Sequence, residues 1–312
     1  MKLYLGIDGG GTKTEAVLLD AEERELACIT GGSTNPHAVG YDTAIAELKA
    51  ILDRSIAQAQ AQSSSAPPRF RIALGMAGVS TDEERSLITE TVTAYLSEKR
   101  IEGEAFVTND AEIALTATLG REHGVLAIAG TGSIVFGCTP EGERYRTGGW
   151  GHLLGDEGSG YRIGLDTLQA VMRSYDGVYP PTAMTRLITE AHGYHTITEL
   201  KGYIYQPGIK KQDIAHFARY AIEASASGDE VACQVVERNA LELAGHAITL
   251  INKHASFHCA DVVLSGSIFK HSALFNESFR QQVSAAFPQL RMHDALHTPA
   301  YGAALLAARR TP

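Results

Sequence analysis

The chain has 312 residues, of which 44% are apolar and 20% are charged, a composition typical of globular proteins. This excludes disorder as the main state, and the length predicts about two domains. The 27 basic and 36 acidic residues give a formal net charge of −9. Because affinity for phosphate backbones needs clustered cations, this balance argues against a nucleic acid or an anionic membrane as partner.

The sequence also argues against export and against a membrane anchor. No apolar run approaches the ~20 residues that a membrane-spanning helix needs, and Asp8 interrupts the first apolar stretch, so no signal peptide is readable. The four cysteines, Cys28, Cys138, Cys233 and Cys259, are far apart in sequence. This spacing favours reduced thiols in a cytoplasmic protein over a zinc ribbon or a disulfide framework.

The first part of the chain predicts strands and helices in a mixed order. Short apolar runs bounded by turn residues indicate strands, and apolar residues at helical spacing indicate helices. In chain order we expect strands at 3–8, 12–20 and 25–30, a helix at 41–62, a loop at 63–68, a strand at 71–75, a helix begun by the capping box of Thr81 and Glu84, a strand at 105–108 and a helix at 111–119. The expected order is therefore βββαβαβα.

A similar order begins again at residue 125. Strands at 125–129, 134–138 and 143–146 again surround a turn of Gly, Thr and Ser. Beyond them we expect a mostly helical region at 159–258, with a long apolar stripe that includes Val231, Leu241 and Ile251, then a strand at 261–264 and a helix at 300–309. This self-similarity, at a spacing of about 120 residues, predicts a duplicated architecture.

Two glycine-rich turns join strands, and their glycines have no side chain to cover the backbone amides. Asp8 is followed by Gly9, Gly10 and Gly11 between two strands, which excludes the dinucleotide-binding and P-loop motifs, since both open a helix. Consecutive bare amides can converge on an anion. An ordinary hairpin turn is the alternative, although it needs fewer glycines. The second turn, 130–133, is built alike, and the pair predicts a phosphate-binding cleft.

Short motifs in these regions resemble those of the superfamily of sugar kinases, Hsp70 chaperones and actin. Residues 5–14, LGIDGGGTKT, and residues 129–133, AGTGS, resemble its two phosphate motifs, and residues 263–267, VLSGS, resemble its adenosine motif. Residues 75–78 and 300–304 are similar to its connecting segments, whose small residues let elements cross closely.

Two further strings narrow the resemblance. GSTN at 32–35 and GGWGHLLGDEGS at 148–159 are similar to the N-acetylglucosamine kinases of the BadF/BadG/BcrA/BcrD group. The resemblance implies two duplicated actin-like, ribonuclease H-like lobes, each βββαβαβα, with a cleft between them. The expected lobes are 1–121 with 299–312, and 122–298 with a helical insertion. It also implies a homodimer, ATP and Mg²⁺, and transfer of phosphate to the 6-hydroxyl of an amino sugar.

Two carboxylates are candidates for the chemistry. Asp8 ends a strand beside the glycines. Its carboxylate either holds the metal ion through water or forms part of the turn. Asp110 follows a strand and opens a helix, a position that suits both a proton acceptor and a helix cap. The resemblance matches Asp110 to the catalytic base of the family, which leaves a neighbouring residue to cap the helix.

The remaining candidate site residues follow from the resemblance and from their turns. For the sugar we expect Asn35, Asp110, Gly149, Trp150, Gly151 and Asp156. For the nucleotide we expect Gly10, Gly11, Thr12, Lys13, Gly130, Thr131, Gly132, Gly266 and Ser267. Glycines let the backbone approach a ligand, and the indole offers an apolar wall with one donor.

The alternatives concern the substrate and the class of protein. Glucosamine and N-acetylmuramic acid differ from N-acetylglucosamine by groups that a few loop contacts would read. A dehydratase-activating ATPase is the alternative from another class, but it needs cysteines for an iron–sulfur cluster, and the scattered cysteines offer no obvious set. His192, His195, His254 and His258 lack acidic or cysteine partners in sequence, which argues against zinc.

Overall fold

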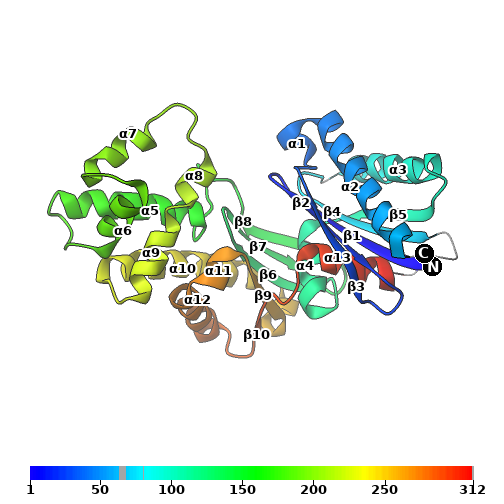
Figure 1. Cartoon of the computed structure of the whole chain (residues 1–312). Helices are drawn as coiled ribbons and strands as arrows, with labels where there is room; N and C mark the ends of the chain where they lie inside the picture. Colours follow the sequence, from blue (N-terminus) through cyan, green and yellow to red (C-terminus); the bar gives the residue numbers. More distant parts are fainter. Residues whose placement is uncertain (63–67, 80, 311–312) are drawn as a thin grey trace. The chain divides into compact units, whose positions relative to one another are not determined.

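The computed structural model describes residues 1–62, 68–79 and 81–310, so the loop predicted at 63–68 lies outside it except for Pro68. The chain forms two compact units, Met1–His123 with Ala295–Pro312, and Gly124–Asp294 (Figure 1). Each unit is built on one five-stranded sheet. The division into functional lobes at the predicted boundaries stays a prediction.

The first sheet has the order β3-β2-β1-β4-β5. The central strand β1 (Lys2–Gly9) is antiparallel to β2 (Thr14–Leu19), which is antiparallel to β3 (Glu25–Gly31). On its other side β1 is parallel to β4 (Arg69–Met76), and β4 is parallel to β5 (Glu102–Thr108). The parallel strands β1, β4 and β5 therefore end at the same edge.

The second sheet repeats this arrangement. Its order is β10-β9-β6-β7-β8, which is the order of the first sheet when the strands are counted from β6. The strands are β6 (Gly124–Ala129), β7 (Ser133–Cys138), β8 (Arg144–Gly148), β9 (Asp261–Ser265) and β10 (Arg291–Asp294). The prediction of a duplicated α/β fold is confirmed.

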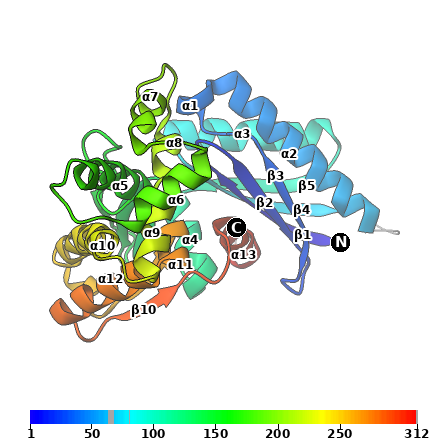
Figure 2. The same ribbon diagram turned by 60° about the vertical axis from the view of Figure 1, so that its left-hand side comes forward.

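Helices cover both faces of the first sheet. They are α1 (Pro36–Val39), α2 (Tyr41–Gln62), α3 (Asp82–Glu98), α4 (Asp110–Leu119) and α13 (Pro299–Arg309). Side chains alternate along β1, so Leu3, Leu5 and Ile7 pack in one cluster with α2 and α3. Tyr4 packs in the opposite cluster, with α13 and Ile113 of α4. Figure 2 shows α2 and α13 on the two sides of the sheet.

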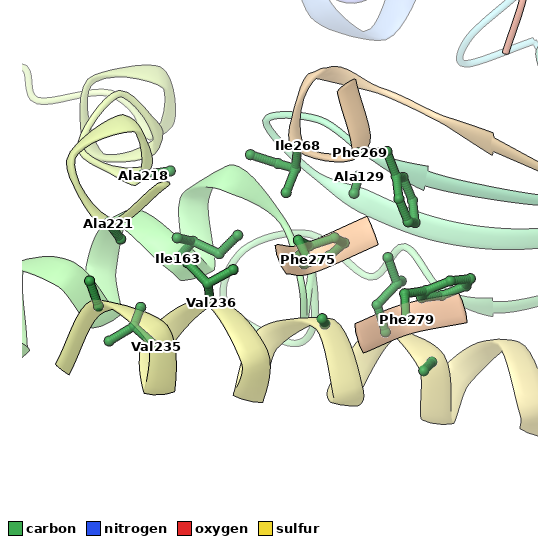
Figure 3. Close-up of a cluster of buried hydrophobic side chains, with 14 of the residues drawn as sticks. Ala129, Ile163, Ala218, Ala221, Val235, Val236, Ile268, Phe269, Phe275 and Phe279 are labelled. Carbon is green, nitrogen blue, oxygen red and sulfur yellow. The ribbon is translucent and has the colours of Figure 1, made fainter. Parts of the chain in front are cut away.

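The second unit carries a helical insertion between β8 and β9. Its helices are α5 (Gly160–Tyr175), α6 (Ala183–His192), η1 (Ile197–Glu199), α7 (Leu200–Ile204), α8 (Lys211–Ala215), α9 (Ala218–Ala226) and α10 (Glu230–Ile251), followed by η2 (Ala255–Cys259), α11 (Ser267–His271) and α12 (Ala273–Ala286). Figure 3 shows Ile163 and Val236 in the same apolar cluster as Phe275 and Phe279. None of the described helices is long and apolar enough to cross a membrane.

Two details differ from the prediction. The expected order βββαβαβα includes a fifth strand in each lobe, but the position of strand β10 was not located in the sequence, because a four-residue edge strand with partly exposed side chains carries almost no alternating pattern. Leu241 was placed on the buried stripe of α10 but is 45% exposed. The buried face of that helix runs through Ala240, Leu243 and Ala247, and Leu241 lies about 100° around the helix from Ala240.

Small residues at 300–304 do let α13 cross its neighbours closely. A Cβ atom on Gly302 would lie 2.0 Å from the Ile113 carbonyl oxygen, and one on Gly6 would lie 2.1 Å from the Ala300 carbonyl oxygen. The glycines therefore permit backbone contact between α13 and both α4 and β1.

We expect Gly302→Ala to lower the free energy of unfolding by about 1–3 kcal/mol, since the new methyl group meets backbone that cannot move aside. Gly245→Ala in α10 is the control, because no atom lies within 4 Å of its Cβ position. It should stabilise the protein by about 0.5–1 kcal/mol through helix propensity. Thermal melting of both variants checks this, and a rise in both melting points would contradict the close crossing of α13.

Candidate active site

The first glycine turn is a tight hairpin with exposed backbone. The Gly10 amide donates to the Lys13 carbonyl oxygen at 3.0 Å, which closes the turn between β1 and β2. Gly11, Thr12 and Lys13 are exposed, and a Cβ atom on Gly10 would lie 2.7 Å from the Lys13 oxygen. The Lys13 ammonium lies 3.8 Å from Glu15 and its side chain is 75% exposed. This geometry suits binding of an anion by main-chain amides.

The segment after β3 is fixed to this hairpin. The Ser33 hydroxyl donates to the Gly10 carbonyl oxygen at 3.0 Å. The Thr34 hydroxyl, which is fully buried, bonds to that of Thr14 at 2.9 Å. A Cβ atom on Gly9 would lie 2.5 Å from the Thr34 hydroxyl oxygen. The turn that carries Asn35 therefore has a defined position relative to the glycines.

Asn35 is the N-cap of α1 and contacts two glycine segments. Its Oδ1 accepts from the His37 amide at 2.9 Å. A Cβ atom on Gly78, whose φ is +83°, would lie 2.5 Å from that Oδ1, and a Cβ atom on Gly11 would lie 3.8 Å from Nδ2. The carboxamide thus lies between the first hairpin and residues 75–78, and Asn35 caps the helix with its oxygen while its Nδ2 remains a donor.

The helix that begins at Asp110 is capped by its neighbours. Asn109 is the N-cap, and its Oδ1 accepts from the Ala111 amide at 2.8 Å. The buried Glu112 completes the capping box and also accepts a hydrogen bond from Thr108. Asp110 Oδ1 accepts from Ala111 at 2.9 Å, and among the described residues no side chain pairs with its carboxyl. Asn109 and Glu112 form the capping box, and Asp110 adds to the cap only through the Ala111 amide, which Asn109 also accepts.

Asp8 and Asp110 lie at the same edge of the first sheet. In register, Asp8 of β1 faces Gly75 of β4, which faces Thr108 at the end of β5. Asp110 follows Thr108 by two residues. The carboxyl ends of parallel strands are where α/β folds place their sites.

The electrostatics of the two carboxyls are coupled. Burial, then repulsion by Asp110 and Glu15, raises the pKa of Asp8 to about 7, and Lys13 offsets only part of this. Partial burial also raises the pKa of Asp110, against the effect of backbone hydrogen bonds. A raised pKa at a carboxyl is typical of sites that handle protons or cations.

The carboxylate oxygens of Asp8 and Asp110 fit a hard divalent cation. The charge on Asp8 is unfavourable beside Asp110 and Glu15, and a cation at this edge would relieve that repulsion. Mg²⁺ prefers oxygen ligands and takes one or two carboxylates together with nucleotide phosphates. In residues 1–62, 68–79 and 81–310 no three His, Cys, Asp or Glu side chains are grouped to hold a metal by themselves.

The second glycine turn is held by the start of α5. The Gly130 amide donates to the Gly132 carbonyl oxygen at 2.9 Å, and the Gly160 amide donates to the Gly130 oxygen at 2.7 Å. The Tyr161 amide donates to the Thr131 oxygen at 3.3 Å. These hydrogen bonds join the turn to the start of α5, while Thr131 itself is exposed.

Gly266 follows β9 and crosses the end of β6. Its φ is +105°, and a Cβ atom there would lie 2.3 Å from the Ala129 carbonyl oxygen. Only glycine fits this contact. Gly266 and Ser267, the first residue of α11, therefore lie beside the strand that leads into the second hairpin.

The segment 149–159 contains four backbone positions in the left-handed region. Gly149, Gly151 and Gly158 have φ values of +70°, +84° and +75°, and Asp156 has +63° although it carries a side chain. Trp150 is 62% exposed, and the Arg146 guanidinium lies 4.1 Å from the centre of its ring. The indole is thus held by a cation–π contact and is not part of the core.

Asp156 is buried and ion-paired. Its Oδ2 lies 2.5 Å from the Lys211 ammonium, and its Oδ1 lies 3.5 Å from the Ser133 amide. The sequence predicts a sugar-binding role for Asp156, which stays a prediction. Lys211 was missed, because nothing in the local pattern of residues 205–215 distinguishes it from a solvent-exposed lysine.

The structure therefore gathers the predicted residues in two sets. The first unit holds Asp8, the 10–13 hairpin, Asn35 and Asp110. The second unit holds the 130–132 hairpin, Gly149, Trp150, Gly151, Asp156, Gly266 and Ser267. Each set contains one glycine hairpin and at least one carboxylate beside it.

Residues 5–307 match the BadF/BadG/BcrA/BcrD ATPase family. The chain belongs to this family. A protein of Clostridium acetobutylicum named N-acetylmuramic acid/N-acetylglucosamine kinase is 30% identical over 312 residues, with 98% of each chain covered. The N-acetyl-D-glucosamine kinase of Dictyostelium discoideum is 32% identical over 317 residues, again with 98% of each covered.

Among solved structures, a ROK family glucokinase from Streptomyces griseus in complex with glucose and AMPPNP is similar in fold. The TM-score is 0.59 at 16% sequence identity, and 98% of each chain is covered. The expectations of an actin-like duplicated fold, of an enzyme of the kinase class and of ATP as the nucleotide are confirmed.

Proposed function

We propose that this protein transfers the γ-phosphate of ATP to the 6-hydroxyl of N-acetylglucosamine. The observation that carries the proposal is the carboxyl of Asp110, which lies beside Asp8 while Asn109 and Glu112 cap the helix. A carboxylate at a strand end that pairs with no side chain among the described residues is suited to accept a proton from a hydroxyl. The amino-sugar kinases to which the full chain is similar support the choice of substrate.

In this proposal the residues have separate roles. Asp110 accepts the proton of the attacking hydroxyl and orients it. Phosphoryl transfer needs little covalent help, so positioning and charge stabilisation supply most of the catalysis. The amides of the 10–13 and 130–132 hairpins, with Thr12 and Thr131, bind the phosphates, and Gly266 and Ser267 contact the nucleoside.

Asp8 is the residue that would hold Mg²⁺, directly or through water. When bound, the ion would neutralise the phosphate charge. Asn35, Gly149, Trp150, Gly151 and Asp156 would bind the sugar, with Asn35 Nδ2 and the Trp150 indole nitrogen as donors. An apolar indole face next to a donor suits a sugar ring, which presents both C–H and O–H groups.

A coupled assay of ADP release over a panel of amino sugars tests the proposal. We expect turnover with N-acetylglucosamine, and we expect none with 6-deoxy-N-acetylglucosamine, which should instead inhibit competitively because it lacks only the acceptor hydroxyl. Turnover of the 6-deoxy sugar would contradict the 6-hydroxyl as acceptor.

The same panel decides among the alternative substrates. A higher kcat/KM for glucosamine or N-acetylmuramic acid would replace N-acetylglucosamine as the preferred sugar. Absence of sugar-dependent ADP release, together with a brown colour on anaerobic purification, would favour the dehydratase-activator alternative. Light scattering of the purified protein tests the expected homodimer.

A further inference from the structure

Lys211 extends its ammonium over the second glycine hairpin. A Cβ atom on Gly132 would lie 2.9 Å from Lys211 Nζ, so the cation is in contact with the turn. The side chain is 26% exposed, whereas that of its partner Asp156 is 4% exposed. The ammonium therefore lies at the boundary between the hairpin and solvent, with its counterion on the buried side.

The backbone fixes this lysine in place. Lys211 is the first residue of α8, and α8 contacts α5 so closely that a Cβ atom on Gly164 would lie 2.1 Å from the Ile214 carbonyl oxygen. The first amide of α5, at Gly160, donates to the Gly130 oxygen of the hairpin. A continuous set of main-chain contacts thus links the lysine to the hairpin.

The ammonium retains the capacity to bind a second anion. It has three N–H donors, and the contact that defines its position is the one to Asp156 Oδ2 at 2.5 Å. Asp156 also approaches the Ser133 amide, which places the carboxylate beneath the turn. A partner on the buried side limits the rotamers of the lysine, and such preorganisation lowers the entropic cost of binding a ligand.

We propose that Lys211 is a nucleotide-binding residue whose ammonium contacts the phosphates of ATP over the 130–132 hairpin. This rests on the proposed function, because it places the phosphates at that hairpin. The chemistry recognised is a nucleoside di- or triphosphate. Asp156 acts on the nucleotide only by positioning the ammonium.

The test compares Lys211→Met with Lys211→Arg and with Lys201→Met, a matched loss of charge at an exposed lysine of α7. Titration calorimetry with ADP and with adenosine gives the affinities, and steady-state kinetics give KM for ATP and for the sugar.

We expect Lys211→Met to weaken ADP binding about 10- to 100-fold, in line with loss of a charge-assisted hydrogen bond. Adenosine affinity should change by less than about threefold, Lys211→Arg should retain most of the ADP affinity, and Lys201→Met should match the wild type.

Lys211→Met leaves Asp156 buried without its cation, which can prevent folding. Asp156→Asn and the double variant Lys211→Met/Asp156→Asn avoid this, because neither leaves a carboxylate unpaired. We expect the double variant to bind ADP about 10-fold or more weakly than Asp156→Asn. If the two bind ADP equally, or if adenosine affinity falls as much as ADP affinity, the ion pair is structural and the inference is wrong.

The outcomes also separate this inference from the proposed function. Lys211-dependent ADP binding without phosphorylation of any amino sugar would overturn the proposed function and keep the inference. Amino-sugar phosphorylation with ADP affinity independent of Lys211 would keep the proposed function and overturn the inference.

Discussion

Asp110→Asn should lower kcat for the amino sugar by about 10²–10⁴-fold, the usual contribution of a general base. ADP affinity should stay within about threefold, because the phosphate-binding hairpins are unchanged. The fold should also be intact, since Asn109 and Glu112 form the capping box of α4 and the asparagine side-chain oxygen can still accept from the Ala111 amide. Single-turnover kinetics with saturating ATP and sugar measure the loss in the chemical step.

The chain contains a close structural match for the control. Asp82 is the first residue of α3, its N-cap is Thr81, and Glu84 completes the capping box, as Asn109 and Glu112 do for Asp110. Asp82 is 94% exposed. Asp82→Asn should therefore leave kcat unchanged. If Asp110→Asn retained activity within tenfold of the wild type, Asp110 would not be the base.

Asp8→Asn should abolish turnover and at the same time stabilise the protein in the absence of nucleotide and metal. Burial and the repulsion from Asp110 and Glu15 raise the pKa of Asp8 to about 7 from 3.8, so the folded state favours the protonated carboxyl. Stability from this group is full below the unfolded pKa and is lost as the pH rises through about 7. Because asparagine cannot ionise, the Asp8→Asn variant does not lose this stability as the pH rises.

The expected gain is about 1–3 kcal/mol at pH 8, reduced from the full linkage value because Asp8 is partly exposed. It should shrink toward zero as the pH approaches 4. Thermal melting across this pH range measures it. A gain that did not depend on pH would show that the pKa of Asp8 is not raised in the folded state.

Asp20→Asn provides a control with the opposite sign. Burial would raise the pKa of Asp20, but hydrogen bonds from the backbone and side chain of Arg24 and from the Glu22 amide lower it overall. Its ionised form therefore stabilises the turn between β2 and β3, and the stability is present above the unfolded pKa and lost as the pH falls through the folded pKa. Asp20→Asn should lower the melting point at neutral pH, whereas Asp8→Asn should raise it.

Local patterns were enough for the elements that depend on neighbouring residues. The helix at 41–62 has the predicted ends, and the capping box of Thr81 and Glu84 forms as expected. Both glycine turns join strands, as their flanking apolar runs predict. Periodicity, caps and turns involve residues a few positions apart, so they can be read directly from the chain.

The dual interpretation of Asp110 could not be resolved from its position. An aspartate at the start of a helix suits capping and catalysis equally, and the decision rests on the side chains of Asn109 and Glu112 and on the proximity of Asp8. The first two are neighbours in sequence, but Asp8 is brought close only by the parallel pairing of β1, β4 and β5.

The amino-acid order alone identified the two hairpins, the carboxylate of Asp8 beside the first one and the resemblance to the family, because these features are contiguous strings whose chemistry is local. The fold decided that Asp110 and Glu15 help to raise the pKa of Asp8 and that Lys211 lies against Gly132. These contacts join residues from different strands and helices. They arise when apolar faces pack and bring distant segments together, and no short pattern around Lys211 or Asp156 records that pairing.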